Sequence, residues 1–205
     1  LMEAADRVDS TAGVQMAYMK RWAPRALKPL ELRLPALLPG QGRATQADAV
    51  EIAAEVEADL VYLDPPYNQH SYLGNYHVWE SLTLWDKPET YGIANKRIDV
   101  RTRKSAFNSR PGIGPALSSV VERLRAPNLI VSFNDEGYLS RDALVEMLSV
   151  RGHVHVIDIA RPRYVGARIG IHNRKGEKVG EVGRLRNVEH LFVVSDRRVD
   201  LPVAA

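Results

Sequence analysis

Apolar residues along this chain follow two spacings, one typical of strands and one typical of helices. The runs predicted as strands, where apolar residues are continuous or alternate, are 59–63, 128–133, 153–159 and 189–195. Runs with apolar residues at helical spacing are 112–125 and 140–152, the second between Ser140 as cap and Gly152 as stop. Strands that alternate with helices of this length predict an α/β layered fold with a mostly parallel sheet.

The last two predicted strands form an exception to that alternation. A long polar loop joins 153–159 to 189–195, and this loop contains no helical pattern. A connection without a crossover helix predicts an antiparallel pair. We therefore expect an antiparallel hairpin at one edge of the sheet.

The first sixty residues carry weaker patterns. Residues 10–22 have apolar residues near helical spacing, and Pro24 closes the segment. Residues 30–34 alternate strictly, which predicts a hairpin arm or an edge strand. Residues 43–48 are predicted as a short strand that leads into a helix ending at Glu57. We divide the chain at residue 28, into a helical segment 1–28 and a main domain 29–205.

Composition narrows the class of protein. A chain of 205 residues with 45% hydrophobic residues is long enough for one sizeable core. The net charge of +3 is mild evidence for a polyanionic partner. The absence of cysteine excludes disulfides and thiolate metal sites and fits a cytoplasmic protein. Nothing in the sequence resembles a signal peptide or a membrane span, so we expect no membrane partner.

The strand predicted at 59–63 ends in Asp64, Pro65, Pro66 and Tyr67, which together can hold a nucleobase amine. The exocyclic amine of adenine or cytosine is a poor nucleophile until acceptors bind its N–H bonds. The Asp64 carboxylate is one acceptor, and the Pro65 carbonyl is a second. Both prolines lack an N–H and have a fixed φ, so the carbonyls are rigid and exposed. Tyr67 is positioned to stack on a base swung out of its helix, although an ordinary strand-closing turn remains the alternative.

These residues resemble the Dam-type DNA adenine methyltransferases, which carry Asp-Pro-Pro-Tyr. Residues 128–135 are similar to the family's strand ending in Ser-Tyr-Asn-Asp, and 189–194 are similar to its last strand. The resemblance covers most of the chain and implies a Rossmann-like, S-adenosylmethionine-dependent methyltransferase sheet with an antiparallel C-terminal hairpin. It implies in-line methyl transfer from S-adenosylmethionine to adenine N6 of double-stranded DNA, with no protein nucleophile or metal. It further implies a bacterial-type, DNA-associated cytoplasmic enzyme, with a restriction endonuclease as a candidate partner.

Part of the cofactor site that the family implies is not evident in the sequence. The family's glycine-rich turn and the acidic residue for the cofactor ribose would precede residue 1. We therefore expect the first strands to be missing and segment 1–28 to be the end of a recognition region. We interpret the glycines of 164–170 as part of a loop rather than as a permuted cofactor site. The resemblance places Asp48 and Asp64 at the cofactor, while Asp48 can also cap the helix that follows it.

Candidate contacts with DNA lie at Asn68 and in three segments. Residues 69–77 directly follow the Asp-Pro-Pro-Tyr turn, and the resemblance implies a flap over the flipped base; a loop with inward-packed tyrosines is the alternative. The basic run 87–104 and the loop 161–186 are candidate phosphate contacts, with a solvated surface as the alternative. The residues assigned to DNA are Asn68, His70, Tyr72, Asn75, Lys104, Arg163 and Arg168.

Two other functions fit the same sequence. An RNA methyltransferase that acts on an adenine or guanine amine is one, because some carry a similar acidic Pro-Pro turn. A non-catalytic nucleic-acid-binding remnant without the cofactor segment is the other, and it predicts salt-dependent DNA binding with no affinity for S-adenosylmethionine. The aspartate at position 64 favours adenine over cytosine, since relatives that act on cytosine N4 more often have serine there.

Overall fold

The computed structural model describes residues 24–92, 95–163, 171–172, 178–181 and 183–199. The contacts divide the chain into two compact units, which we name the helical unit (1–46 and 72–104) and the sheet unit (47–71 and 105–205). The helix predicted at 10–22, the glycines of 164–170 and Arg168 lie outside the described residues. In the part of the chain that the structure describes, no helix has the length and apolar character needed to cross a membrane.

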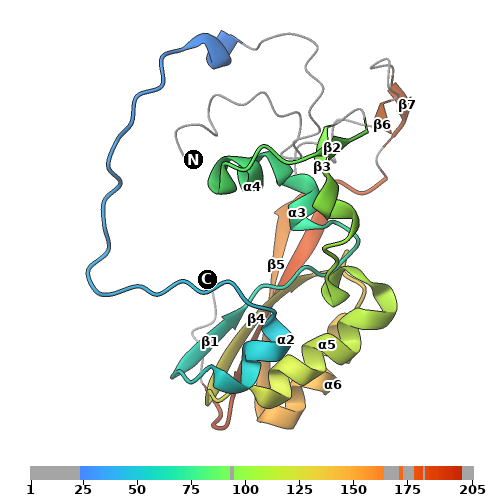
Figure 1. The fold of residues 1–205 in the computed structure, drawn as a ribbon. Coiled ribbons are helices and arrows are strands. Elements are labelled where there is room, and N and C mark those ends of the chain that lie inside the picture. Colours follow the sequence, from blue (N-terminus) through green and yellow to red (C-terminus); the bar gives the residue numbers. More distant parts are fainter. Residues whose placement is uncertain (1–23, 93–94, 164–170, 173–177, 182, 200–205) are drawn as a thin grey trace. The chain divides into compact units, whose positions relative to one another are not determined.

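The sheet unit is built on a four-stranded sheet (Figure 1). Its strands, in spatial order, are β1 (Leu60–Leu63), β4 (Asn128–Asn134), β8 (Arg186–Ser195) and β5 (His153–Pro162). β1 and β4 are parallel, whereas β8 is antiparallel to both of its neighbours. The fold is therefore mixed α/β with a mainly antiparallel sheet, and the prediction of a mostly parallel sheet is wrong.

The position of β8 explains that error. β1, β4 and β5 all run in the same direction, and helices follow β1 and β4 as expected. β8 returns without a crossover helix and inserts between β4 and β5, so two of the three pairings become antiparallel. The predicted antiparallel hairpin of the last two strands is confirmed, and β5 forms that edge of the sheet.

Two helices cover one face of the sheet, α5 (Arg110–Arg123) and α6 (Arg141–Leu148) (Figure 1). Apolar side chains of both helices share one core with alternate residues of β4 and β8: Ile113, Leu117, Val121, Leu144, Leu148, Leu129, Val131, Phe133, Phe192 and Val194. The Ser140 hydroxyl accepts a hydrogen bond from the Ala143 N–H at 3.2 Å and caps α6 as predicted. Both predicted helices are confirmed.

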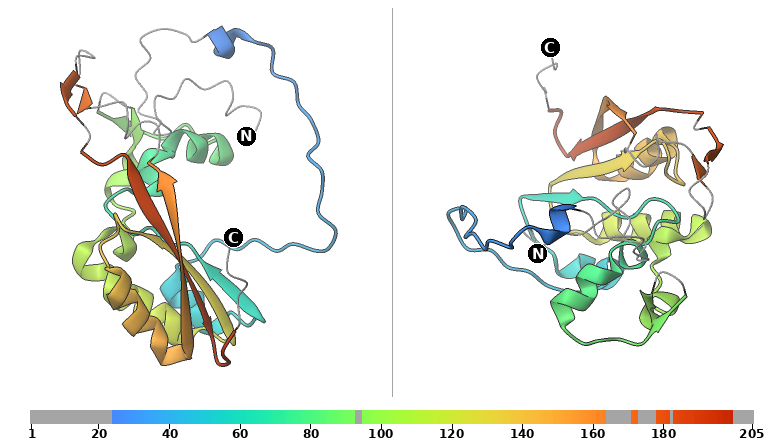
Figure 2. Two further views of the ribbon diagram at one scale, coloured as in Figure 1. Left: turned by 180° about the vertical axis from the view of Figure 1, so that it is seen from behind. Right: turned by 90° about the horizontal axis from the view of Figure 1, so that it is seen from above.

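Within the sheet unit, no described helix lies over the opposite face of the sheet. Tyr62, Ile130, Leu191 and Val193 alternate with the core residues and are half-buried or exposed. Seen from behind, β8 and β5 lie nearest to the viewer and no helix of the sheet unit crosses them (Figure 2). β1 also pairs with no described strand on its outer side, where Leu60 is 50% and Tyr62 57% exposed.

Short elements complete the sheet unit. They are α2 (Ala49–Ile52), the 3-10 turns η2 (Ala53–Glu55), η4 (Ala106–Asn108) and η5 (Ser149–Arg151), and the short strands β6 (Ile171–His172) and β7 (Lys178–Gly180). The strand predicted at 43–48 is wrong, since these residues are exposed and pair with no described strand. The helix predicted to reach Glu57 ends at Ile52 and continues only as the η2 turn.

Gly152, between η5 and β5, is required by both its conformation and its surroundings. Its φ is +135°, and an added Cβ would lie 2.4 Å from the Ser195 carbonyl oxygen. We expect Gly152→Ala to lower the free energy of unfolding by about 2 kcal/mol or more, because a strained φ adds to a clash with backbone. Gly183→Ala is the matched control, with no atom within 4 Å of its added Cβ. Urea unfolding of both variants tests this, and equal losses would contradict it.

Among its described residues, the helical unit contains short elements and one longer helix, α4. They are η1 (Pro24–Leu27), α3 (Tyr72–Asn75), α4 (His77–Leu84), β2 (Thr90–Tyr91), β3 (Lys96–Arg97) and η3 (Ile98–Arg101). The strand predicted at 30–34 is wrong, because no described strand pairs with this segment and Leu34 is 99% exposed. Alternation alone does not make a strand when no partner supplies the hydrogen bonds.

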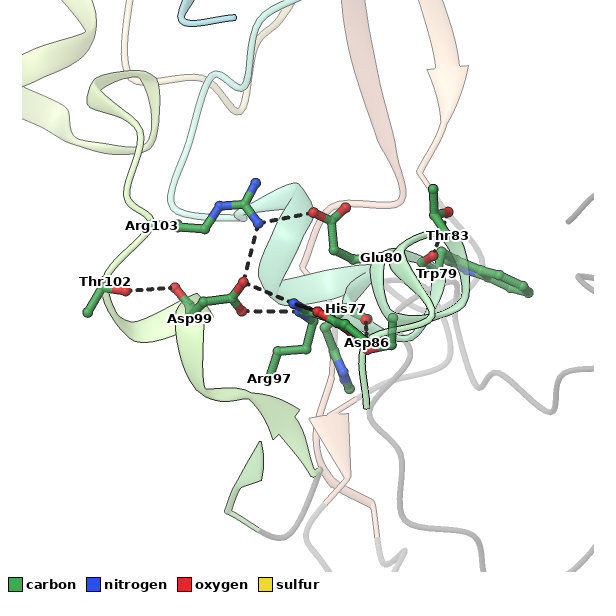
Figure 3. A network of polar contacts seen from close by, with 10 residues as sticks. His77, Trp79, Glu80, Thr83, Asp86, Arg97, Asp99, Thr102 and Arg103 are labelled. Atoms are coloured by element: carbon green, nitrogen blue, oxygen red, sulfur yellow. Dashed lines mark hydrogen bonds and ion pairs between the residues drawn. The ribbon is translucent and has the colours of Figure 1, made fainter. Parts of the chain in front are cut away.

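Ion pairs around Arg97 stabilise the helical unit (Figure 3). The buried Arg97 guanidinium donates two hydrogen bonds to the Asp86 carboxylate, each 2.7 Å long, and two to Asp99, each 3.2 Å long. Arg103 bridges Glu80 at 3.0 Å and Asp99 at 3.3 Å. Hydrogen bonding to Arg97 lowers the pKa of both aspartates. Arg97 and Arg103, both in the basic run, are therefore engaged in pairs within this unit.

Candidate functional site

The Asp-Pro-Pro-Tyr turn lies at the carboxyl end of β1, beside the carboxyl end of the parallel strand β4. Leu63 pairs with Val131, so β4 continues past the turn to Asn134. Asp64 is exposed, whereas the two prolines and Tyr67 are half-buried. In open α/β sheets this edge, outside the carboxyl ends of parallel strands, is where ligands bind.

A pocket of about 340 Å³ opens beside this turn. Its lining consists of Ala47, Asp48, Ala49, Tyr62, Leu63, Asp64, Pro65, Pro66, Ser105, Phe107, Leu117 and Val120. The pocket thus has mainly apolar walls and two carboxylates, a composition typical of small-molecule sites. The structure brings together Asp48 and Asp64, the two residues predicted to hold the cofactor.

Asp48 also has a structural role. Its Oδ1 accepts a hydrogen bond from the Val50 N–H at 2.8 Å and caps α2. The capping interpretation is therefore confirmed, and it orients the carboxylate beside the pocket. The interpretation as a cofactor contact stays a prediction.

Tyr67 is held by contacts on its ring, its hydroxyl and its backbone. The ring packs against Phe133 with centroids 5.4 Å apart and planes inclined at 46°. The Tyr67 hydroxyl accepts a hydrogen bond from Asn134 Nδ2 at 2.8 Å, and the Tyr67 carbonyl accepts one from the Tyr138 N–H at 2.8 Å. The predicted stacking of Tyr67 on a flipped base stays a prediction.

The backbone after Tyr67 is fastened by a second asparagine. Asn108 Nδ2 donates to the Asn68 carbonyl at 2.8 Å and to the His70 carbonyl at 3.1 Å. Asn68 Oδ1 accepts from the His70 N–H at 3.0 Å, which closes the turn locally. His70 is exposed and Asn68 is half-buried, so this pair presents one polar side chain to solvent.

Sequence reasoning missed Asn108 and Asn134. Asn134 stands in the segment similar to the family's Ser-Tyr-Asn-Asp strand, which was a signal that this position matters. Asn108 has no comparable signal, because asparagine is an ordinary turn residue. Their importance appears only when segments far apart in the sequence come together.

Two ion pairs order the end of β4. Arg184 pairs with Asp135, and Arg163 pairs with Glu136 at 2.6 Å. Arg163 also donates to the Arg184 carbonyl at 3.1 Å. Arg163 was predicted to contact phosphate, and in the structure its guanidinium is engaged in these contacts within the protein. Its contact with DNA stays a prediction.

Glu189 on β8 is a half-buried acidic side chain whose pKa is raised by its surroundings. Burial raises the pKa of Glu189 most, and the charges of Asp135 and Asp64 raise it further, while a hydrogen bond with Asn134 lowers it. The carboxylates of Asp135 and Asp64 are therefore close enough to Glu189 to raise its pKa.

The raised pKa of Glu189 predicts how stability depends on pH. A folded state that holds this proton more tightly than the unfolded state loses stability as the pH rises above the ordinary glutamate value of 4.5. We expect Glu189→Gln to be more stable than the unsubstituted protein at pH 7 and to reduce this loss. Urea unfolding between pH 4 and pH 8 measures it, with the exposed Glu146→Gln as control. A lower stability of Glu189→Gln at pH 7 would contradict the assignment.

The remaining residues assigned to DNA belong to the helical unit. Tyr72 and Tyr76 stack with centroids 6.3 Å apart, and they are 51% and 43% exposed. The alternative of inward-packed tyrosines is therefore wrong for this pair. Asn75 is half-buried, and Lys104 donates from Nζ to the Val100 carbonyl at 2.8 Å. Contacts of Tyr72, Asn75 and Lys104 with DNA stay predictions.

Comparison with known proteins places this chain beside enzymes that modify DNA. A family model described as D12 class N6 adenine-specific DNA methyltransferase matches residues 1–120. The Type II methyltransferase M.FokI of Planomicrobium okeanokoites is 32% identical over 154 residues, which cover 74% of this chain and 24% of that protein. The Type II methyltransferase M.NlaIII of Neisseria lactamica is 30% identical over 184 residues, covering 88% of this chain and 54% of that protein.

A third relative is also named as a methylase. The modification methylase StsI of Streptococcus sanguinis is 30% identical over 166 residues, covering 80% of this chain and 25% of that protein. The matched part of the chain thus spans between about a quarter and about half of the length of these relatives. No solved structure shows significant similarity to the chain.

Proposed function

The chain belongs to the D12 class N6 adenine-specific DNA methyltransferases, and we propose that it carries the residues that hold the target base in such an enzyme's active site. The reaction proposed is transfer of a methyl group from S-adenosylmethionine to N6 of adenine in double-stranded DNA. One observation carries the proposal: Asp48 and Asp64 line the same pocket at the edge of the sheet where the Asp-Pro-Pro-Tyr turn lies.

The residues of the turn have separate roles in this proposal. The Asp64 carboxylate and the Pro65 carbonyl accept the two N–H bonds of the adenine amine, which directs the nitrogen lone pair toward the methyl donor. Pro66 keeps the turn rigid, and Tyr67 stacks on the base. S-adenosylmethionine, when bound, supplies an electrophilic methyl group attached to a sulfonium. The amine held by Asp64 and Pro65 would form its bond to that methyl group as the bond to sulfur breaks, and its proton would leave to solvent.

The pocket fits the adenosine end of the cofactor. Its volume of about 340 Å³ lies within the ordinary range of small-molecule sites. Phe107, Leu117 and Val120 supply an apolar wall for a purine, and Asp48 supplies an acceptor for a ring amine or a hydroxyl. Asp64 belongs both to the pocket lining and to the turn, so it would contact the cofactor as well as the base.

The outer edge of β1 supports a larger, Rossmann-like sheet. Leu60 and Tyr62 are half-exposed there, and an unpaired strand edge invites further strands. We propose that the first strands of the methyltransferase sheet pair with this edge. Additional helices then cover the face that carries Leu191 and Val193. In this arrangement segment 1–28 is the end of a recognition region and 29–205 is part of the catalytic domain.

The proposed substrate determines the proposed partners and location. An adenine-N6 methyltransferase acts on cellular DNA, so we propose a cytoplasmic, DNA-associated enzyme. Relatives named type II methyltransferases or modification methylases support a restriction endonuclease as partner. His70 and Asn68 are the proposed DNA contacts beside the turn. The exposed tyrosines at 72 and 76 are proposed contacts of the helical unit.

Calorimetric titration with S-adenosylmethionine tests the cofactor site. We expect the unsubstituted protein to bind and Asp48→Ser to bind about tenfold more weakly, since one acceptor is lost at a cost of roughly 1.4 kcal/mol. Serine is itself a good N-cap, so Asp48→Ser should keep the melting temperature. Unchanged affinity would restrict Asp48 to its capping role. No binding by the folded, unsubstituted protein would favour the non-catalytic nucleic-acid-binding alternative.

A further inference from the structure

We propose that Asn134 is a positioning residue that fixes the orientation of the Tyr67 ring. This inference rests on the proposed function, in which Tyr67 stacks on the target base. It adds a residue from β4, 67 positions away along the chain, to the machinery around the Asp-Pro-Pro-Tyr turn.

Asn134 is almost entirely buried, with 4% of its surface exposed, and both ends of its amide have partners. Its Oδ1 accepts the Glu136 N–H at 2.9 Å, and its Nδ2 donates to the Tyr67 hydroxyl at 2.8 Å. The Glu189 carboxylate is a further hydrogen-bond partner of this side chain. The bond to the Glu136 backbone fixes which end of the amide faces Tyr67, since only the oxygen can accept that N–H. A buried amide that loses such a partner carries a desolvation cost, so this orientation is strongly favoured.

The Tyr67 ring also packs against an aromatic residue at the end of β4. Phe133, the residue before Asn134, contacts it with a centroid distance of 5.4 Å. Gly137 makes room for Phe133, because a Cβ at Gly137 would lie 2.9 Å from Phe133 Cε1. The end of β4 thus supplies both a ring contact and a hydrogen bond. Together they leave Tyr67 little freedom to rotate about its side-chain bonds.

A fixed ring matters for a stacking role in particular. If the ring becomes ordered only when the base binds, the lost side-chain entropy weakens the binding of the base. A ring that is already ordered avoids this cost. A shift of about 1 Å in a positioning group can lower a rate by about 10²-fold. The Asn134 bond is therefore expected to act on the transfer step through Tyr67, without contact between Asn134 and the substrate.

Kinetics of Tyr67→Phe, Asn134→Ala and the double variant test the inference, using tritiated S-adenosylmethionine and unmethylated genomic DNA. Tyr67→Phe keeps the ring and its packing and removes only the hydroxyl acceptor. We expect each single variant to lower kcat by about tenfold, with the KM for S-adenosylmethionine unchanged, and the double variant to be no worse than the worse single variant. Asn128→Ala is the control: Asn128 is on the same strand and donates to the Asp59 carbonyl at 2.9 Å.

The outcomes separate this inference from the proposed function. If the unsubstituted protein and Tyr67→Phe are equally active, the positioning role alone is overturned. A roughly hundredfold lower kcat in the double variant would also overturn it, because the effects of independent residues multiply. Unsubstituted protein without transfer would overturn the proposed function, and the positioning role with it. If Asn134→Ala fails to fold, Tyr67→Phe decides the question, since its ring still fills the site.

Discussion

Asp64→Ala is expected to lower kcat for methyl transfer to adenine by about 10²- to 10³-fold. The carboxylate is one of the two acceptors that orient the target amine, and removing one preorganised hydrogen-bonding group from an active site typically has an effect of this size. That factor corresponds to roughly 3–4 kcal/mol of lost transition-state stabilisation. Single-turnover kinetics with labelled S-adenosylmethionine measure it directly.

The controls for Asp64→Ala separate chemistry from folding. Asp64 is exposed, so its removal should change the free energy of unfolding by less than about 0.5 kcal/mol. Asp142→Ala, on the first turn of α6 with a side chain that is 96% exposed, should keep full activity. Transfer by Asp64→Ala at the rate of Asp142→Ala would show that the Asp-Pro-Pro-Tyr turn is only a strand-closing turn.

Phe192→Ala is expected to be the most destabilising substitution in the sheet unit, by about 3–5 kcal/mol. Phe192 is fully buried on β8, an interior strand of the sheet, and it packs in the core beneath α5 and α6. Domains of this kind have a total stability of roughly 5–15 kcal/mol, so the variant should also be expressed poorly. Urea unfolding monitored by circular dichroism gives the difference.

Leu191→Ala is the matched control for Phe192→Ala. Leu191 is the neighbouring residue on β8, and its side chain lies on the opposite, half-exposed face of the sheet. We expect it to lose less than half as much stability, because it makes fewer buried contacts. An equal or greater loss from Leu191→Ala would contradict the assignment of the two faces.

The parts of the fold set by local pattern could be predicted from the sequence. Strands at 59–63 and 128–133, the cap at Ser140 and the stop at Gly152 are each encoded within a few residues. The parts that depend on partners could not. Insertion of β8 between β4 and β5 is decided by pairings over long sequence distances, and residues 30–34 alternate without a described strand to pair with.

In the candidate site too, some residues could be predicted from the sequence and others could not. Asp64 was identified from its residue type and position and Asp48 from the family resemblance, and the structure places both in the lining of one pocket. Asn108 and Asn134 were not identified, since each acts on a turn that is about 40 or 67 residues away. Arg163 was assigned to phosphate from the charge pattern, and its pairing with Glu136 depends on how β4 and the loop before β8 come together.

Analysis of the methylated product tests the central claim most directly. The purified protein is incubated with S-adenosylmethionine and with DNA or RNA, the nucleic acid is digested to nucleosides, and methylated bases are identified by mass spectrometry. The account predicts N6-methyladenine in DNA, absent when Asp64→Ala replaces the unsubstituted protein. Methylated bases in RNA alone, N4-methylcytosine in DNA, or no methylated base from a folded protein would contradict it.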